Sequence, residues 1–522
     1  MRVRVIALLA VLAPAAPLAP AADYWAYQYK NIDVTVAGTS GYAQHVARNA
    51  DRLGVALAQI LDFKASSRLP THIFVLPDER IVQLLGGSGS STYSTTGYDT
   101  TVIASAGLSN ENHFWGVYFG YIGSLLAGDG ALRYPYWFKL GVPEVFAFTE
   151  LDHAHVRTGG LAPAYALIVG SRKLIPMRTF LALDAQDPQL QSGALAETYA
   201  AQSWFLTREI LVEGRHRDEF ARYLALLNDG QPEASAFAAS FASSYEDLDR
   251  MLHDDLGTSA HVYVLSSPAD ERPDAVPPRK LAAPEIAARL AEAALLSGHR
   301  PEALQLAGQA LNDDPANETA LRVACEAQLL NWNYPAVLAA VNAMAAHGTP
   351  SPRALATSAA ALTILASAVD AGHASLGVDA APLLAAARAD YRAALAADPE
   401  DLRSWAGLAG LYGAARDTQA AGELLPAAEA AFARHPRNAN LAYALAHMCA
   451  QTRRWECAVS FAAAWRENAL SASSRAEAAA FEAHLRAYRQ RLASAAPAAP
   501  AAAPPASGAP ALDAAPAPSA SH

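Results

Sequence analysis

Three histidines in the first half of the chain could do metal chemistry. His113 comes just before a predicted helix, and His153 and His155 alternate on one face of a predicted strand. Imidazoles that converge in this way are common metal ligands. The sequence favours a simpler interpretation, in which His153 and His155 face solvent beside Asp152 and His113 belongs to the entry of the helix. We therefore predict no metal site and no cofactor.

The other candidate catalytic groups are isolated. Glu144 and Glu150 could act as an acid–base pair, but they lie six residues apart on a predicted helix and do not share a face closely. The sequence has no G-x-S-x-G nucleophile motif, and Ser171-Arg172-Lys173 lacks the S-x-x-K spacing. Tyr199 and Gln202 are expected to pack within a helix. We predict no catalytic residues.

A mixed pattern of strands and helices surrounds these residues. A Gly-Gly-Ser-Gly-Ser run at 86–90 is typical of a flexible loop, because no Lys follows it and it trails a helix rather than a strand. Alternating and helical periodicities predict strands at 31–36, 71–77, 100–104, 149–157 and 261–265, and helices at 40–61, 79–85, 111–126, 137–148 and over much of 164–256, with Ser40 as a helix cap.

The composition divides the chain near residue 283. The 522 residues are enough for two or three domains, and 31 of the 43 aromatic residues precede residue 283, whereas Ala makes up about a third of the remainder. The hydrophobic content of 52% excludes a disordered chain, and the net charge of −11 gives no support to nucleic-acid binding. Three cysteines are too few for a disulfide scaffold.

Residues 1–22 are typical of a signal peptide. A short basic start and an apolar run precede Ala19-Pro20-Ala21, which fits the small-x-small rule, so we expect cleavage near Ala21 or Ala22. The apolar run is too short for a membrane anchor and is interrupted by proline, and no other stretch is long enough for a span. We expect an exported protein, periplasmic or secreted, with no membrane span.

The stretch from Val117 to Glu150, in its setting of strands and helices, resembles the zinc-binding core of gluzincin-type (peptidase MA-like) metallopeptidases. Active members carry H-E-x-x-H on a helix, which supplies two zinc ligands and the general-base Glu. A later W-x-x-E-G-x-A-E segment supplies the third ligand through its first Glu. The resemblance covers residues 23–265 and implies an α+β domain.

This chain lacks the metal-binding groups of that family. Phe119 and Gly123 stand at the two His positions, Gly120 at the general base and Leu140 at the third ligand. None of these side chains offers a donor atom, and a catalytic zinc site needs about three protein ligands. The residues that keep the pattern are Trp137, Gly141 and Glu144. The resemblance therefore implies a pseudopeptidase domain.

Residues 284–472 resemble tetratricopeptide (TPR) repeats, which are helix pairs with a period of about 34 residues. Trp405, Leu408, Ala409 and Tyr412 reproduce the W-x-x-L-G-x-x-Y pattern with Ala for Gly. Four less regular repeats accompany this one, and residues 374–382 interrupt the array. The resemblance implies a concave surface that binds a protein or peptide. A helical bundle without a partner is the alternative.

The remaining segments join or end these parts. Residues 266–283, which contain four prolines, are predicted to be a linker. Residues 473–492 are predicted to be a capping helix, and residues 493–522, almost all Ala, Pro and Ser, a disordered tail.

The three cysteines leave one question open. Cys449 and Cys457, one on each helix of the last pair, either form a disulfide or are two small buried residues, and Cys325 is expected to lie in the core.

The sequence thus predicts an α+β domain followed by an all-α repeat array. We expect an exported binding or scaffold protein that is not an enzyme and that takes a protein or peptide partner through the repeats. The alternatives are an active zinc peptidase with an unconventional site and an assembly factor for envelope proteins.

Overall fold

The computed structural model of the chain divides into two compact units. A mixed unit extends to Ile286, and a helical unit begins at Ala287. The predicted signal peptide, the loop at 86–90, His113 and the tail from 495 onward lie outside the described residues. The described residues are 23–61, 69–85, 92–96, 100–106, 115–128, 134–184, 187–190, 193–229, 231–254, 262–266, 276–415, 418–469 and 472–494.

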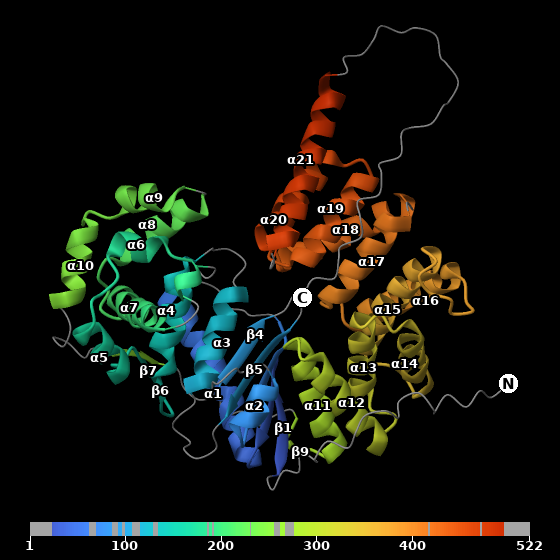
Figure 1. Ribbon diagram of the computed structural model, residues 1–522, viewed down its shortest axis with the longest axis horizontal. Coiled ribbons are helices and arrows are strands. Elements are labelled where there is room, and N and C mark those ends of the chain that lie inside the picture. The colour runs from blue at the N-terminus through green and yellow to red at the C-terminus, as the bar shows by residue number, and fades with distance from the viewer. Residues whose placement is uncertain are drawn as a thin grey trace. The chain divides into compact units, whose positions relative to one another are not determined.

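A six-stranded mixed sheet forms one part of the first unit (Figure 1). Its order is β4-β5-β3-β2-β1-β9, in which β2, β3 and β5 are parallel and β4, β1 and β9 are antiparallel to their neighbours. A smaller sheet has the order β6-β7-β8. The strands are β1 (Tyr24–Tyr29), β2 (Ile32–Ala37), β3 (Thr71–Leu76), β4 (Thr92–Thr96), β5 (Thr101–Ala106), β6 (Glu150–Leu151), β7 (His155–Thr158), β8 (Tyr263–Ser266) and β9 (Arg279–Lys280).

Helices pack around these sheets. The first, α1, connects β2 to the parallel strand β3, as a parallel pair requires. The helices of this unit are α1 (Ser40–Leu61), α2 (Glu79–Leu84), α3 (Trp115–Gly128), α4 (Tyr136–Ala147), α5 (Pro163–Ser171), α6 (Met177–Ala182), the 3₁₀ turn η1 (Pro188–Leu190), α7 (Ala194–Leu211), α8 (Arg217–Asn228), α9 (Glu233–Ser240) and α10 (Tyr245–Asp254).

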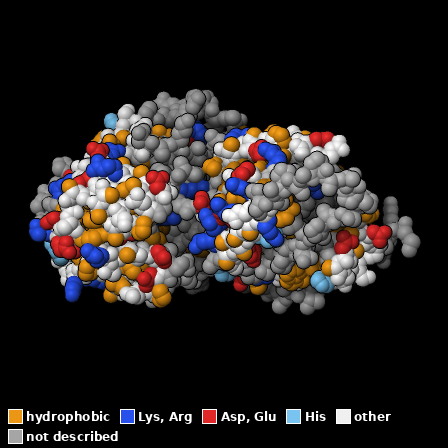
Figure 2. Space-filling model, turned by 90° about the horizontal axis from the view of Figure 1, so that it is seen from above, with side chains coloured by type: hydrophobic (Ala, Val, Ile, Leu, Met, Phe, Trp, Pro, Cys, Tyr) orange, Lys and Arg blue, Asp and Glu red, His pale blue; other side chains and the backbone are white. Residues whose placement is uncertain are grey.

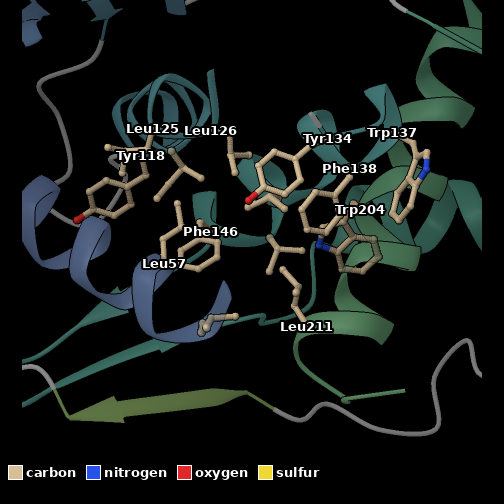
Figure 3. Packing of buried hydrophobic residues seen from close by; sticks show 14 of the residues in the cluster. Leu57, Tyr118, Leu125, Leu126, Tyr134, Trp137, Phe138, Phe146, Trp204 and Leu211 are labelled. Atoms are coloured by element: carbon tan, nitrogen blue, oxygen red, sulfur yellow. The ribbon is translucent and has the colours of Figure 1, made fainter. Parts of the chain in front are cut away.

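The core of the first unit joins the sheet to α1, α3, α4 and α7. Leu57 of α1 points toward Phe146 of α4 in Figure 3, and the rings of Tyr134, Phe138 and Trp204 lie together. The ring centroids of Tyr134 and Phe138 are 5.3 Å apart. Large aromatic side chains fill this core, as the aromatic-rich first half of the sequence predicts.

The second unit consists of successive helix pairs (Figure 1). We call the first helix of each pair the A helix and the second the B helix. Small alanines such as Ala291, Ala307 and Ala310 are buried where the helices pack. The pairs are α11 (Ala283–Leu296) with α12 (Arg300–Asp313), α13 (Glu318–Leu330) with α14 (Tyr334–Ala346), α15 (Pro352–Asp370) with α16 (Ala380–Ala397), α17 (Leu402–Ala415) with α18 (Thr418–Arg434), and α19 (Ala439–Gln451) with α20 (Trp455–Asn468), followed by α21 (Ala472–Ser494).

The turns between A and B helices repeat one backbone feature. Gly298, Trp332 and Arg453 each lie two residues beyond their A helix and have φ of 83°, 57° and 58°. This left-handed conformation suits glycine and is uncommon for other residues. The same turn in three pairs confirms a helical repeat, and the long A helix α15 and the segment before α16 account for the predicted interruption.

Several sequence predictions need correction. The cap of α1 is Thr39, not Ser40, because the Thr39 Oγ1 accepts from the Tyr42 N–H at 3.2 Å. The strand predicted at 149–157 is the hairpin β6–β7 with a turn between. The predicted linker at 266–283 contains β9, which pairs with β1 and so belongs to the sheet. Strands β1, β4 and β9 were not predicted at all.

Candidate functional site

Helix α3 lies between the sheet and α4, and it carries Phe119, Gly120 and Gly123, three of the four positions that the sequence resemblance aligns with a zinc site. It packs against β4 and β5 on one side and against α4 on the other. Phe119 stacks on Trp115, one turn earlier, with ring centroids 5.3 Å apart. Leu140 lies on α4, where it is half-buried against the core. The four positions therefore lie on two helices in direct contact.

Gly120, which the sequence resemblance aligns with the general base, has no space for a side chain without a shift of its neighbours. A Cβ there would lie 2.8 Å from Ile103 Cγ2 and 3.2 Å from Ser94 Cβ. Contacts this short are not tolerated without a shift of the neighbours. The helix is thus packed closely onto β4 and β5, and the glycine is required for this packing.

Gly123 faces the other helix. A Cβ at this position would meet Pro143 Cγ of α4 at 3.7 Å, which is an ordinary van der Waals contact. Pro143 follows Leu140 by three residues, so Gly123 and Leu140 lie near one another across the α3–α4 contact. The atom that a Cβ on Gly123 would meet is a proline carbon, and neither Gly123 nor Leu140 has a side-chain donor for a metal.

Glu144 is the polar group that the structure places in this region. It is 4% exposed, and its Oε1 accepts a hydrogen bond from the Tyr165 hydroxyl of α5 at 2.6 Å. The Trp115 indole also faces the carboxyl and favours its charged form, but Oε2 has no hydrogen-bond partner among the described side chains. Burial outweighs both neighbours and raises the pKa of Glu144 to about 7.

The sequence did not predict that Glu144 is a buried carboxyl with a raised pKa. It kept the family pattern, but its burial depends on Trp115 and on Tyr165, which lie far from it in sequence. The only available signal was a charged residue in an otherwise apolar segment. Glu150 does not accompany it, because Glu150 lies exposed on β6.

The histidines do not form one site in the described structure. His153 lies in the exposed turn between β6 and β7, and His155 lies on β7, so the prediction that both share a strand face was wrong. The Asp152 Oδ1 accepts from the backbone N–H groups of Ala154 and His155, each at 2.8 Å, and shapes this turn. His113 lies outside the described residues.

Helix α7 packs on α4 through equally close contacts. A Cβ on Gly141 would lie 2.2 Å from Thr207 Oγ1 and 2.3 Å from the Ser203 carbonyl oxygen. Gln202 of α7 forms two hydrogen bonds with the backbone of Ile175. Its Oε1 accepts from the Ile175 N–H at 3.0 Å, and its Nε2 donates to the Ile175 carbonyl at 2.7 Å. The predicted packing role of Gln202 is therefore confirmed, and Tyr199 is buried beside it.

The A helices of the second unit share a face lined by ion pairs, which we call the A-helix face. Glu292 of α11 accepts from Arg322 of α13 at 2.8 Å and pairs with Arg353 of α15 at 3.0 Å. The second of these contacts passes over one repeat.

Glu326 of α13 makes a similar contact further along the A-helix face. It accepts from Thr357 of α15 at 2.9 Å and from Arg403 of α17 at 2.5 Å, again passing over one repeat. Burial opposes the charge on Glu326, but Arg403 and Arg322 outweigh it and hold its pKa below the ordinary value. These two contacts tie the first helix pair to the third and the second to the fourth.

Helix α17 has a bare position on this face. Gly410 follows Arg403 by seven residues, so both lie on the same side of the helix. A Cβ on Gly410 would meet nothing within 4 Å. The A-helix face thus has open space beside its charged pairs.

Two of the three cysteines are joined. Cys449 of α19 and Cys457 of α20 form a disulfide, which resolves the question that the sequence left open. Glu429 lies beside them, and these three side chains are the one cluster of possible metal ligands within the described residues, although both sulfurs are bonded to each other. Cys325 is buried and unpaired, as predicted.

No family model and no curated protein matches the chain. Solved structures resemble it, among them three that contain TPR repeats or act in pilus biogenesis by their descriptions. TTC0263, a thermophilic TPR protein of Thermus thermophilus, is 18% identical, with 38% of this chain and 98% of that chain covered and a TM-score of 0.31. PilW, described as a widely conserved type IV pilus biogenesis factor, is 15% identical over 41% and 93%, with a TM-score of 0.30. The P58(IPK) TPR domain is 11% identical over 63% and 78%, with a TM-score of 0.20.

These TM-scores are low, so we base function on the residues of this chain alone. Among the described helices, α15 is long and apolar enough to cross a membrane by length and composition, but 56% of its apolar window is buried in the repeat array. On the face drawn in Figure 2, acidic, basic and hydrophobic side chains lie interspersed.

Proposed function

We propose that the chain is an exported, non-catalytic scaffold, in which a degenerate metallopeptidase-like unit is joined to a TPR array that binds a protein or peptide. The close packing around Gly120 supports the non-catalytic role of the first unit. The general-base position is not merely occupied by a different residue, because a Cβ there would lie 2.8 Å from Ile103. A carboxylate could not stand at this position without a shift of α3 or of Ile103 and Ser94 beneath it.

The edge of the large sheet supports a docking role for this unit. Strand β4 ends the strand order and carries no charge and no proline over Thr92–Thr96. The opposite edge, β9, is two residues long and both are basic. An uncharged edge strand is able to pair with an extended segment of another protein.

The A-helix face supports the binding role of the second unit. Its ion pairs give it fixed charged groups, and Gly410 leaves the helix surface open between them. Stacked helix pairs offer extended surfaces of this kind for polypeptide ligands.

Zinc content and proteolysis test the non-catalytic proposal. We expect the purified mature protein to contain no stoichiometric zinc and to leave casein intact. Stoichiometric zinc together with chelator-sensitive cleavage would establish the alternative, an active zinc peptidase with an unconventional site.

A matched pair of arginine substitutions tests the binding proposal. Gly410→Arg places a long side chain on the A-helix face, whereas Gly422→Arg places one on the B helix α18, and neither Cβ meets an atom within 4 Å. We expect Gly410→Arg to lose partners that the wild type and Gly422→Arg both retain in an affinity capture from the envelope fraction. Equal capture by all three proteins would refute the role of this face. Capture of unfolded envelope proteins would favour the remaining alternative, an envelope-protein assembly factor.

A further inference from the structure

Three helices of the repeat unit converge on the disulfide. Cys449 of α19 is fully buried, Cys457 of α20 is half-buried, and Glu429 belongs to the neighbouring helix α18. The Sγ of Cys457 lies 3.4 Å from Glu429 Oε1. Both sulfur atoms and a carboxylate oxygen of Glu429 lie within 4.8 Å of one another. The structure thus brings two sulfur atoms and one carboxylate to the same place.

The backbone holds the two cysteines close together without help from the disulfide. Their Cα atoms are 5.8 Å apart. The turn between α19 and α20 closes on the Cys449 carbonyl, which accepts from the Arg454 N–H at 2.8 Å and from the Thr452 hydroxyl at 3.1 Å. Buried Ala446 and Ala458 let the two helices pack closely. None of these contacts involves a sulfur atom, so all of them can persist when the disulfide is reduced.

Reduction converts the two bonded sulfur atoms into metal donors. A dithiol reductant opens the disulfide by thiol–disulfide exchange, in which it gives two electrons and two protons to the cysteines and is itself oxidised to a disulfide. Cys457 is the more accessible sulfur for this attack, because Cys449 is fully buried. A metal ion then displaces the two thiol protons, since the thiolate is the form that binds metals.

The three side chains suit a divalent cation that prefers sulfur. Zn²⁺ binds thiolate and carboxylate ligands together, and three protein ligands leave a fourth position for water. Two thiolates and one carboxylate carry three negative charges, so Zn²⁺ leaves one negative charge in excess. Arg454 lies 3.4 Å from Glu429 Oε1 and supplies the balancing positive charge.

We propose that Glu429, Cys449 and Cys457 form a redox-gated site for Zn²⁺ or a similar thiophilic cation. The disulfide closes the site, and a dithiol reductant opens it. The bound metal then replaces the link that the disulfide provides between α19 and α20, and Glu429 extends this link to α18. The site is independent of the A-helix face, and it leaves the oxidised protein without zinc.

Metal titration of the full-length protein tests the site, with Co²⁺ as the spectroscopic probe and Zn²⁺ as its competitor. After reduction by a dithiol and removal of the dithiol without air, we expect one bound Co²⁺ with a thiolate charge-transfer band that Zn²⁺ abolishes. The oxidised protein should show no band. A Cys449→Ser, Cys457→Ser double variant, which retains Cys325, should show none even after reduction. Absence of the band in the reduced wild type, or an equal band in the double variant, would overturn the proposal.

Glu429→Gln tests the third ligand. The two thiolates remain in this variant, so we expect the band to persist and the affinity for Zn²⁺ to fall about tenfold or more. Glu423→Gln, a matched change at an exposed position of α18, should leave the affinity unchanged. Equal affinities of the wild type and Glu429→Gln would refute the three-residue site.

Thermal unfolding gives a measurement that does not depend on any variant. Zn²⁺ should raise the unfolding temperature of the repeat unit in the reduced protein, because it binds the folded helices. It should have no such effect on the oxidised protein, in which the disulfide occupies both sulfur atoms. An unchanged unfolding temperature of the reduced protein in Zn²⁺ would contradict the proposal.

Discussion

Glu144 is a buried carboxyl whose Oε1 accepts from Tyr165, whereas its Oε2 has no hydrogen-bond partner among the described side chains. The pKa is raised by burial from an ordinary 4.5 to about 7. The unfolded chain ionises first as pH rises, so stability is lost from about pH 4.5 to about pH 7 and then stays low. Each pKa unit corresponds to about 1.4 kcal/mol, so the loss is roughly 3 kcal/mol.

Glu144→Gln should remove this part of the pH dependence. We expect urea unfolding of the wild type to give a free energy roughly 3 kcal/mol lower above pH 7 than below pH 4.5 because of this group, and the variant to lack that difference. Glu150→Gln serves as the control, because Glu150 is exposed. Identical pH profiles for the wild type and Glu144→Gln would mean that the carboxyl is solvated.

Trp332 has a strained backbone conformation. Its φ is 57° although it is not glycine, and the side chain is 61% exposed, so little packing is at stake. The equivalent residue of the first pair is Gly298. Trp332→Gly should stabilise the protein by about 1 kcal/mol, because the left-handed conformation costs an L-residue roughly that amount. Thermal unfolding measures this, and Trp332→Ala, which keeps a Cβ, should show little gain.

At the scale of elements, α4 is fixed by glycines that differ sharply in their surroundings. Gly141→Ala would place a Cβ 2.3 Å from the Ser203 carbonyl of α7, and we expect a loss of about 3 kcal/mol. Gly123→Ala on α3 meets Pro143 at 3.7 Å and should gain roughly 0.5–1 kcal/mol from helix propensity. Chemical denaturation of the two variants compares them directly, and a tolerated Gly141→Ala would show that α7 is not closely packed on α4.

Elements with strong local signals could be predicted from the sequence, and elements defined by distant contacts could not. The apolar positions of α1 repeat with helical spacing and predicted its C-terminal end at Leu61, whereas its cap is Thr39 rather than the predicted Ser40. In contrast, β9 is two residues long and exists only because it pairs with β1, more than 250 residues earlier. The same holds for sites: the sequence shows side chains without donor atoms at Phe119, Gly120, Gly123 and Leu140, whereas the absence of space at Gly120 depends on Ile103 in the sheet.

At the scale of the whole molecule, the division at residue 286 separates two kinds of stabilisation. The first unit has a continuous aromatic core. The second depends on alanine seams, on ion pairs that pass over one repeat, such as Glu326–Arg403, and on the Cys449–Cys457 disulfide, whose sequence separation is 8. A loop this short contributes about 2 kcal/mol by restricting the unfolded chain. Reduction of the disulfide should therefore lower the stability of the second unit, and ionisation of Glu144 should lower that of the first.

Calorimetry of the full-length protein checks this separation. We expect two unfolding transitions, because each unit has its own core. A reductant should lower the transition of the repeat unit alone, and should have no effect in a Cys449→Ser, Cys457→Ser double variant. Glu144→Gln should raise the other transition alone, by an amount that grows from about pH 4.5 to about pH 7 and is constant above that. If both perturbations moved a single common transition, the two units would unfold cooperatively, and the separation of their stabilising contacts would not hold.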